Sequence, residues 1–324
     1  MVKTEMLERP RRTGEKPMVP RAEFQSYYGR PIVRPPSWKA HNIAGYFFLG
    51  GLAAGSSLLA AAGDLTARPV LRRVGRLAAG VALGGSLVAL IGDLGRPRRF
   101  LNMLRVFRPT SPMNMGSWIL AAYGPLATAA ATIEVLTGGP ASSRVAGRKD
   151  MIGRVAGLGA AALAPGLASY TAVILADTAI PLWHESRREL PFIFVGSAAS
   201  AAGGLAMAVT PMNEASPGRW LAATGAALEI GAEWRLEKRL GMVGEPLKVD
   251  NAGLLLKLSR VLGGAGVALG CAFGGRFRPA AVAGGLFLLL GSACARFSLF
   301  YAGLASSHDP RFTIVPQRDH LKGR

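Results

Sequence analysis

Long apolar runs recur along the whole chain, and they constrain its fold more than any other feature. A helix that crosses a bilayer needs about 20 predominantly apolar residues, which is close to the length of each run. Polar breaks marked by proline or arginine, such as Arg68-Pro69 and Arg96-Pro97, separate the runs. The sequence therefore predicts an all-α integral membrane protein. About eight transmembrane helices are expected, near residues 40–62, 75–92, 113–136, 152–176, 190–210, 218–236, 254–274 and 280–303.

Polar segments flank these helices at both ends of the chain. We expect residues 1–38 to form a polar, basic N-terminal tail, residues 39–305 the transmembrane domain, and residues 306–324 a polar C-terminal tail. The first 38 residues contain no apolar h-region, so no cleavable signal peptide is expected. Insertion would then depend on the first transmembrane helix.

Small residues are unusually common in the apolar runs. The chain has 42 glycines, and aromatic residues make up only 7% of it. Small side chains let helix backbones approach closely in lipid, where burial of apolar surface no longer drives association. Glycine pairs with the spacing typical of such contacts occur at Gly51/Gly55, Gly80/Gly84, Gly153/Gly157 and Gly266/Gly270.

A weak internal similarity links the two halves of the chain. At an offset of 146 residues, Phe48 and Gly50 recur as Phe194 and Gly196. Either the chain contains two duplicated four-helix halves, or alanine- and glycine-rich helices match by chance.

The formal net charge of +19 arises mainly from the tails and the breaks between apolar runs, which argues against nucleic-acid binding. Lys and Arg number 25 on the side of the N-terminus and 11 on the opposite side of the predicted helices. Positive loops stay in the cytoplasm. We therefore expect a multi-pass protein of the bacterial cytoplasmic membrane with both termini cytoplasmic.

Histidine and cysteine limit the possible cofactors. The four histidines are His41, His184, His308 and His320, and they provide no facing pair within the apolar runs for a haem. The two cysteines, Cys271 and Cys294, form no CxxC motif, so no iron–sulfur cluster and no metal site is expected in this chain. Any electron transfer would then use an organic ligand and the cofactors of a partner.

Polar residues near the predicted cytoplasmic face are candidates for binding a quinone. An imidazole, an amide, a phenol and a carboxylate can hydrogen-bond quinone carbonyls and relay the protons that quinone reduction requires. The alternative is that these residues cap helices and contact lipid headgroups. The candidates are His41, Asn42, Asp93, Ser111 and Tyr170, with Asn114 and Ser117 nearby.

Four charged residues suggest a second role. Glu229 and Glu233 lie one turn apart on the sixth predicted helix, and Arg296 lies at a similar depth to Glu233 on the eighth. Together with Asp177 they are candidates for a proton path. The alternative is a structural ion pair, with Glu233 and Arg296 locking two helices together.

Three segments carry a resemblance to a known family. They are GYFFLGGLAAGS from Gly45, DLGRPRRFLNMLRVFRPTSPMNMGSW from Asp93, and SYTAVILADTAIPLWHESRRELPFIF from Ser169. The chain resembles the NrfD/polysulfide reductase membrane-subunit family from about Pro36 to Ala305. The loop motif that begins at Asp93 is the specific part of this resemblance.

The resemblance implies two four-helix bundles that bind a quinone, menaquinone or ubiquinone, without haem. It implies a partner with four 4Fe–4S clusters, which connects the quinone to a molybdopterin or similar catalytic subunit. The quinone residues of the family correspond to His41, Asn42 and Tyr170, and the Asp of the loop motif is Asp93. The order of His41 and Asn42 departs from the family pattern. The partner of familiar assemblies also lies outside the cytoplasm, whereas the charge count places the quinone-side loops inside.

The predicted function is that of a haem-free, quinone-binding membrane anchor subunit of a multi-subunit oxidoreductase. The chain would exchange electrons with an iron–sulfur partner and would not be the catalytic subunit by itself. The alternatives are a proton- or ion-translocating subunit and a passive membrane anchor.

Overall fold

The computed structural model describes residues 31–94, 102–137 and 144–322, without the side chains of 144–150 and 319–322. All regular elements of these residues are helices, and seven of them are long and apolar enough to cross a membrane. The predicted all-α membrane fold is therefore confirmed. The seven spans are Ala40–Leu65, Pro69–Asp93, Pro112–Thr137, Met151–Ala176, Leu190–Val209, Asp250–Phe273 and Arg278–His308.

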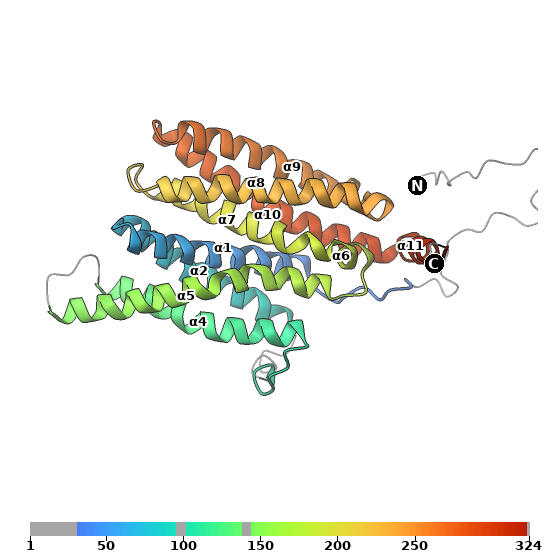
Figure 1. Ribbon diagram of the computed structural model, residues 1–324, viewed down its shortest axis with the longest axis horizontal. Helices are drawn as coiled ribbons and strands as arrows, with labels where there is room; N and C mark the ends of the chain where they lie inside the picture. Colours follow the sequence, from blue (N-terminus) through green and yellow to red (C-terminus); the bar gives the residue numbers. More distant parts are fainter. Residues whose placement is uncertain (1–30, 95–101, 138–143, 323–324) are drawn as a thin grey trace, which may run out of the picture.

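An eighth long helix, α8, covers Ser216–Leu240 but is not among the apolar spans. It packs lengthwise against α7 (Leu190–Val209) in the helix bundle, with its other side exposed. Glu229 and Glu233 explain its polarity, and both are buried. About eight spans remain the best description, because α8 is as long as its neighbours and parallel to them in Figure 1.

The long helices form two four-helix bundles of the same internal order (Figure 1). In each bundle the first helix packs against the second and the fourth, and the third packs against the fourth. The first bundle consists of α1 (Ala40–Leu65), α2 (Pro69–Asp93), α4 (Pro112–Thr137) and α5 (Arg144–Ala176). The second consists of α7, α8, α9 (Asp250–Val267, continued by the π-helical turn Ala268–Phe273) and α10 (Arg278–His308).

Glycines form the seam between the bundles, where α1 meets α7. A side chain at Gly55 would place its Cβ 2.6 Å from Cβ of Ala202 and 2.7 Å from the carbonyl oxygen of Ala198. The Gly51/Gly55 pair therefore brings the two backbones together, as its spacing predicts. The pair Gly153/Gly157 does something else: a Cβ at either position would lie within 3.4 Å of the Arg76 guanidinium, so these glycines make room for a charge.

Several helix ends differ from the predicted ranges. Helix α2 begins at Pro69 rather than near residue 75, because proline at a first helical position has no amide that needs a partner. Helix α10 continues to His308, and a further helix, α11, covers Arg311–Lys322 within the predicted C-terminal tail. Short helices α6 (Pro181–Glu185), η1 (Ser186–Arg188) and η2 (Gly241–Leu247) complete the chain at the same end of the molecule.

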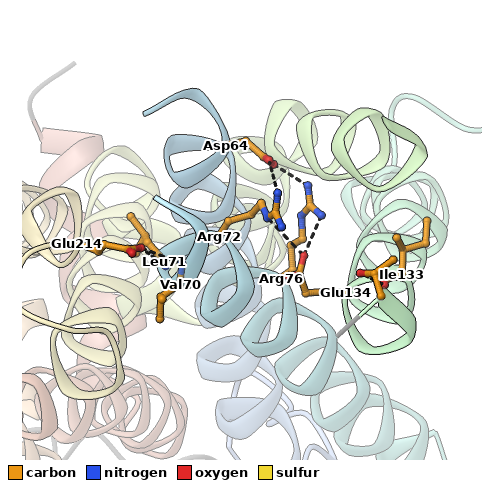
Figure 2. A network of polar contacts seen from close by, with 9 residues as sticks. Asp64, Val70, Leu71, Arg72, Arg76, Ile133, Glu134 and Glu214 are labelled. Atoms are coloured by element: carbon orange, nitrogen blue, oxygen red, sulfur yellow. Dashed lines mark hydrogen bonds and ion pairs between the residues drawn. The ribbon is translucent and has the colours of Figure 1, made fainter. Parts of the chain in front are cut away.

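A buried ion-pair network ties α1, α2 and α4 together at the opposite end (Figure 2). Arg76 follows Arg72 by about one turn of α2 and donates to Asp64 at 2.7 Å and to Glu134 at 3.0 Å. Arg72 lies 3.8 Å from Asp64 and 3.5 Å from Glu134. Beside them, the Glu214 carboxylate accepts hydrogen bonds from the amides of Val70 and Leu71, so the second bundle caps the start of α2.

A candidate ligand cavity at the membrane face

A cavity of about 100 Å³ opens between the four helices of the first bundle. It lies where α1 and α4 begin and where α2 and α5 end, which is the right-hand end of this bundle in Figure 1. Its wall is mostly apolar with a few polar groups, as in small-molecule sites generally. The lining residues are Trp38, Ile43, Tyr46, Phe47, Leu90, Asp93, Leu94, Met103, Met113, Gly116, Ser117, Leu120, Tyr170 and Ile174.

Tyr170 supplies the most distinctive polar group of this wall. Its side chain, on the last turns of α5, is only 7% exposed. Within the described part of the chain, its hydroxyl has no hydrogen-bond partner. A buried hydroxyl normally has one, because leaving it unpaired costs about 1–3 kcal/mol. The phenol is therefore available to a ligand in the cavity.

Gly116 on α4 provides the space that the Tyr170 ring occupies. A Cβ at Gly116 would collide with ring carbons Cδ2 and Cε2 of Tyr170. Gly124, two turns further along α4, has no atom within 4 Å of an added Cβ. Glycine at 116 thus determines where the phenol lies, whereas glycine at 124 does not constrain its surroundings.

Asp93 closes α2 beside the cavity and also fixes the start of α1. Its Oδ1 accepts a hydrogen bond of 3.0 Å from the backbone amide of Lys39. This bond satisfies one of the free amides at the beginning of α1. The carboxylate thereby joins two helix ends at the cavity wall.

Asn114 fastens the segment that covers the cavity on its α4 side. Its Nδ2 donates to the carbonyls of Met103 at 2.9 Å and Val106 at 2.7 Å, and its Oδ1 accepts from the amide of Arg108 at 2.6 Å. Ser117 donates to the carbonyl of Met113 at 3.0 Å. These bonds hold Met103 and Met113 in the wall, where flexible apolar side chains can adapt to a ligand.

The predicted quinone residues separate into two groups. Tyr170 and Asp93 lie in the cavity wall. His41 is exposed and Asn42 is half-buried, and neither lines the cavity. Ser111 accepts a 3.5 Å hydrogen bond from the amide of Asn114 at the start of α4, also outside the wall.

Most wall residues were not among the sequence candidates, and Trp38, Met103, Met113 and Gly116 are four of these. They are apolar, so a search for polar groups near the membrane face passes over them. The signal that was available is the loop motif itself, which contains Met103, Met113 and Gly116.

The predicted ion pair between Glu233 and Arg296 is wrong. Glu233 instead pairs with Arg260 of α9 at 3.0 Å. Arg296 donates to the carbonyl of Phe194 at 2.6 Å, and its guanidinium lies 3.8 Å above the Phe194 ring. Helix α8 packs against α9, so Glu233 meets α9 before it can reach α10. Asp177, the other candidate for a proton path, is exposed just beyond α5.

The fold and this cavity define a class: a multi-pass α-helical membrane protein with a ligand cavity near one membrane face. Among the described residues, no group of three or more His, Cys, Asp or Glu side chains is arranged to hold a metal ion. The mostly apolar wall and the hydroxyl of Tyr170 suit an organic molecule that accepts a hydrogen bond.

The family model described as polysulphide reductase, NrfD, matches residues 33–216. This is more than half of the chain, and the chain belongs to that family. The predicted resemblance is confirmed. Membership implies a membrane subunit of a quinone-linked oxidoreductase, which sits in a lipid bilayer and typically accompanies iron–sulfur and catalytic subunits. No curated protein sequence matched the chain.

The matched region ends at the beginning of α8. It includes the whole first bundle, the cavity and α7. Helices α8, α9 and α10 lie outside it, although the residue-level resemblance was expected to continue to about Ala305.

Proposed function

We propose that this chain is a haem-free, quinone-binding membrane anchor subunit that exchanges electrons between a quinone and an iron–sulfur partner. The observation that carries the proposal is the unpartnered hydroxyl of Tyr170 in a mostly apolar cavity near the membrane face. A quinone, either menaquinone or ubiquinone, has an apolar body and carbonyl oxygens that accept hydrogen bonds. It therefore fits a cavity with a hydroxyl donor and a mostly apolar wall.

Tyr170 would bind and orient the ligand. Its phenol donates a hydrogen bond to a carbonyl oxygen, and this bond strengthens as negative charge develops on that oxygen. Phe47, Met103 and Leu120 keep water away from the same space, which makes the bond more effective. A bound quinone supplies the two-electron, two-proton chemistry.

Asp93 would exchange protons between the cavity and the aqueous face. It lies in the wall and also touches the start of α1, where the chain leaves the membrane. A carboxylate at such a boundary can accept a proton from water and present it to the cavity. His41, Asn42 and Ser111 stand outside the wall, so we assign them no direct contact with the ring.

The iron–sulfur partner would dock on the face that carries the cavity. The short helices α6, η1, η2 and α11 gather at this end and form a surface beyond the spans (Figure 1). Exposed Arg187 and Arg188 add positive charge there. We propose a ferredoxin-like subunit with four 4Fe–4S clusters as this partner, followed by a molybdopterin or similar catalytic subunit.

The charge count supports a cytoplasmic position for this face in a bacterial cytoplasmic membrane, with both termini inside. A phosphatase fused after Arg324 should then be inactive, and a fluorescent protein at the same position should be bright. The reverse pattern would move the partner to the outer face.

Purification of the native complex tests the proposal as a whole. The chain should copurify with an iron–sulfur protein, and solvent extraction should release a quinone from the complex. A complex that contains neither would leave the chain as a passive anchor.

A further inference from the structure

Helix α8 carries a ladder of three glutamates on one face. Glu229, Glu233 and Glu237 are spaced by four residues, so their side chains lie above one another, one turn apart. The ladder covers about 12 Å along the helix axis, at about 1.5 Å per residue. Helix α8 ends at Leu240, at the end of the molecule that carries the ligand cavity (Figure 1). Glu237 therefore lies nearest that face and Glu229 deepest.

Arg260 of α9 pairs with the two outer glutamates of this ladder. It donates to Glu233 at 3.0 Å through Nε and to Glu237 at 2.7 Å through Nη2. Its side chain is 39% exposed and that of Glu237 is 30% exposed, whereas that of Glu233 is 7% exposed. The ladder therefore runs from an accessible outer pair into the interior of the second bundle.

A cavity of about 20 Å³ lies at the inner end of the ladder. Glu229, Glu233, Ser200, Ser259 and Ser292 contribute its polar lining, together with Arg260. Within the described residues, Oε1 of Glu229 and Oγ of Ser200 have no hydrogen-bond partner, although Glu229 is 9% and Ser200 only 2% exposed. Buried polar atoms of this kind are normally paired, and a polar space of about 10–15 Å³ is enough for one water molecule. The cavity therefore fits a water that bridges Glu229 and Ser200.

The next layer of the second bundle is apolar. Met207, Ala222 and Leu288 form a buried cluster there, with Val267 and Cys271 packed against it. Helices α7 and α10 also touch closely at this level, since a Cβ on Gly204 would lie 2.6 Å from the carbonyl oxygen of Gly285. An apolar layer therefore lies on the far side of the cavity from the Arg260–Glu237 pair.

The charges around Glu229 come from three helices. Glu233 and Glu237 lie on α8 itself, Arg260 on α9, and the buried Arg296 on α10. The segments of α7 and α1 that pack near this level carry no ionisable side chain. The surroundings of Glu229 therefore include two negative groups and two positive ones. This balance allows the carboxyl group to exist in either charge state.

We propose that Glu229 is a proton-binding site that is loaded through the glutamate ladder from the membrane face of the ligand cavity. A hydronium ion at that face gives its proton to the outer carboxylates and becomes water. The proton passes from Glu233 through the cavity water to Glu229, which changes from carboxylate to carboxylic acid. The apolar layer prevents proton exchange between Glu229 and the opposite membrane face. The proposal goes beyond electron transfer, and it concerns helices outside the matched family region.

Infrared spectroscopy on the full chain in lipid vesicles tests the proposal without quinone or electron donor, so failure of the proposed function would not affect the result. A pH decrease should produce the carbonyl band of a protonated carboxylic acid. Glu229→Gln should remove the component of that band that belongs to a buried acid, and Glu245→Gln, a matched change at an exposed position of η2, should preserve that component. An unchanged buried-acid component in Glu229→Gln would overturn the assignment.

Two further variants distinguish a loss of proton binding or transfer from a folding defect. Glu229→Asp keeps a carboxyl group and should retain a shifted band. Glu237→Gln removes the outermost carboxylate and should slow band formation several-fold while leaving its final size unchanged. In sealed vesicles sorted by the side on which the C-terminus is accessible, pH changes at the ladder's face should drive the band. A response to the opposite face alone would refute loading through the ladder.

Discussion

The two bundles share one helix order but place their polar groups differently. The first bundle keeps its charges at its ends: Asp93 lies beside the cavity, and Arg76 lies in the network at the opposite end. The second bundle carries Glu229, Glu233 and Arg296 in its interior. Common packing therefore does not impose a common chemistry. The first bundle has a mostly apolar cavity near a membrane face, and the second carries charge at depth.

The shared packing order favours the duplication of a four-helix unit. In both halves the first helix contacts the second and the fourth, and the seam is made by the first helices of each half. The shared feature is the packing order of the helices, and the difference lies in the side chains that they carry.

The largest effect that separates the bundles should follow the loss of Arg76. Arg76→Gln would leave Asp64 and Glu134 buried with less compensation, and the breaking of a buried pair costs about 3–5 kcal/mol. Arg260→Gln should cost much less, because Arg260 and Glu237 are partly exposed. Thermal unfolding in detergent measures both. Equal losses of stability would mean that the first network is no more important than the ladder.

Substitution of Gly116 should impair activity while leaving the second bundle intact. Gly116→Ala would displace the Tyr170 ring, and a misplacement of about 1 Å at a reacting site can cost about 10²-fold in rate. Gly124→Ala on the same helix is the matched control, since its Cβ would meet open space. Quinone-coupled turnover of the assembled complex should fall only in the first variant. Normal turnover in Gly116→Ala would show that the phenol position does not matter.

The smallest effect is expected at His41. Its side chain is exposed and does not line the cavity. His41→Ala should therefore change stability by no more than about 0.5 kcal/mol, as is usual for surface substitutions, and quinone turnover by about twofold or less. Steady-state turnover with a quinone analogue provides the check. A collapse of turnover would restore His41 to the ligand site that the sequence predicted.

The fold could be predicted from the sequence because hydropathy and helix breakers are local signals. Even α8 was predicted, despite its glutamates, because of its length and the prolines at its start. Which side of a helix faces the interior was harder. Ile43, Tyr46 and Phe47 face the cavity, whereas His41 precedes Ile43 by two residues and so lies about 200° away around α1.

Partners across helices were beyond the reach of sequence reasoning. The position of Glu233 along its helix indicates its depth in the membrane but not the residue with which it pairs. The order of helices around the bundle decides between Arg260 and Arg296. The contact between the Tyr170 ring and Gly116 likewise depends on how α5 packs against α4. The loop motif pointed to the right region, and only the folded chain shows which of its residues form the wall.

Replacement of the Tyr170 hydroxyl tests the central claim most directly. Tyr170→Phe keeps the ring on Gly116 and removes only the donor, so the cavity and the docking surface should persist. Quinone-coupled and dye-coupled activities are measured on the same assembled complex. Quinone-coupled turnover should fall by about 10²-fold, as expected for the loss of a donor in a water-poor site, while reduction of a soluble dye by the partner stays at its normal rate. Wild-type quinone turnover in this variant would contradict the assignment of the cavity as the quinone site.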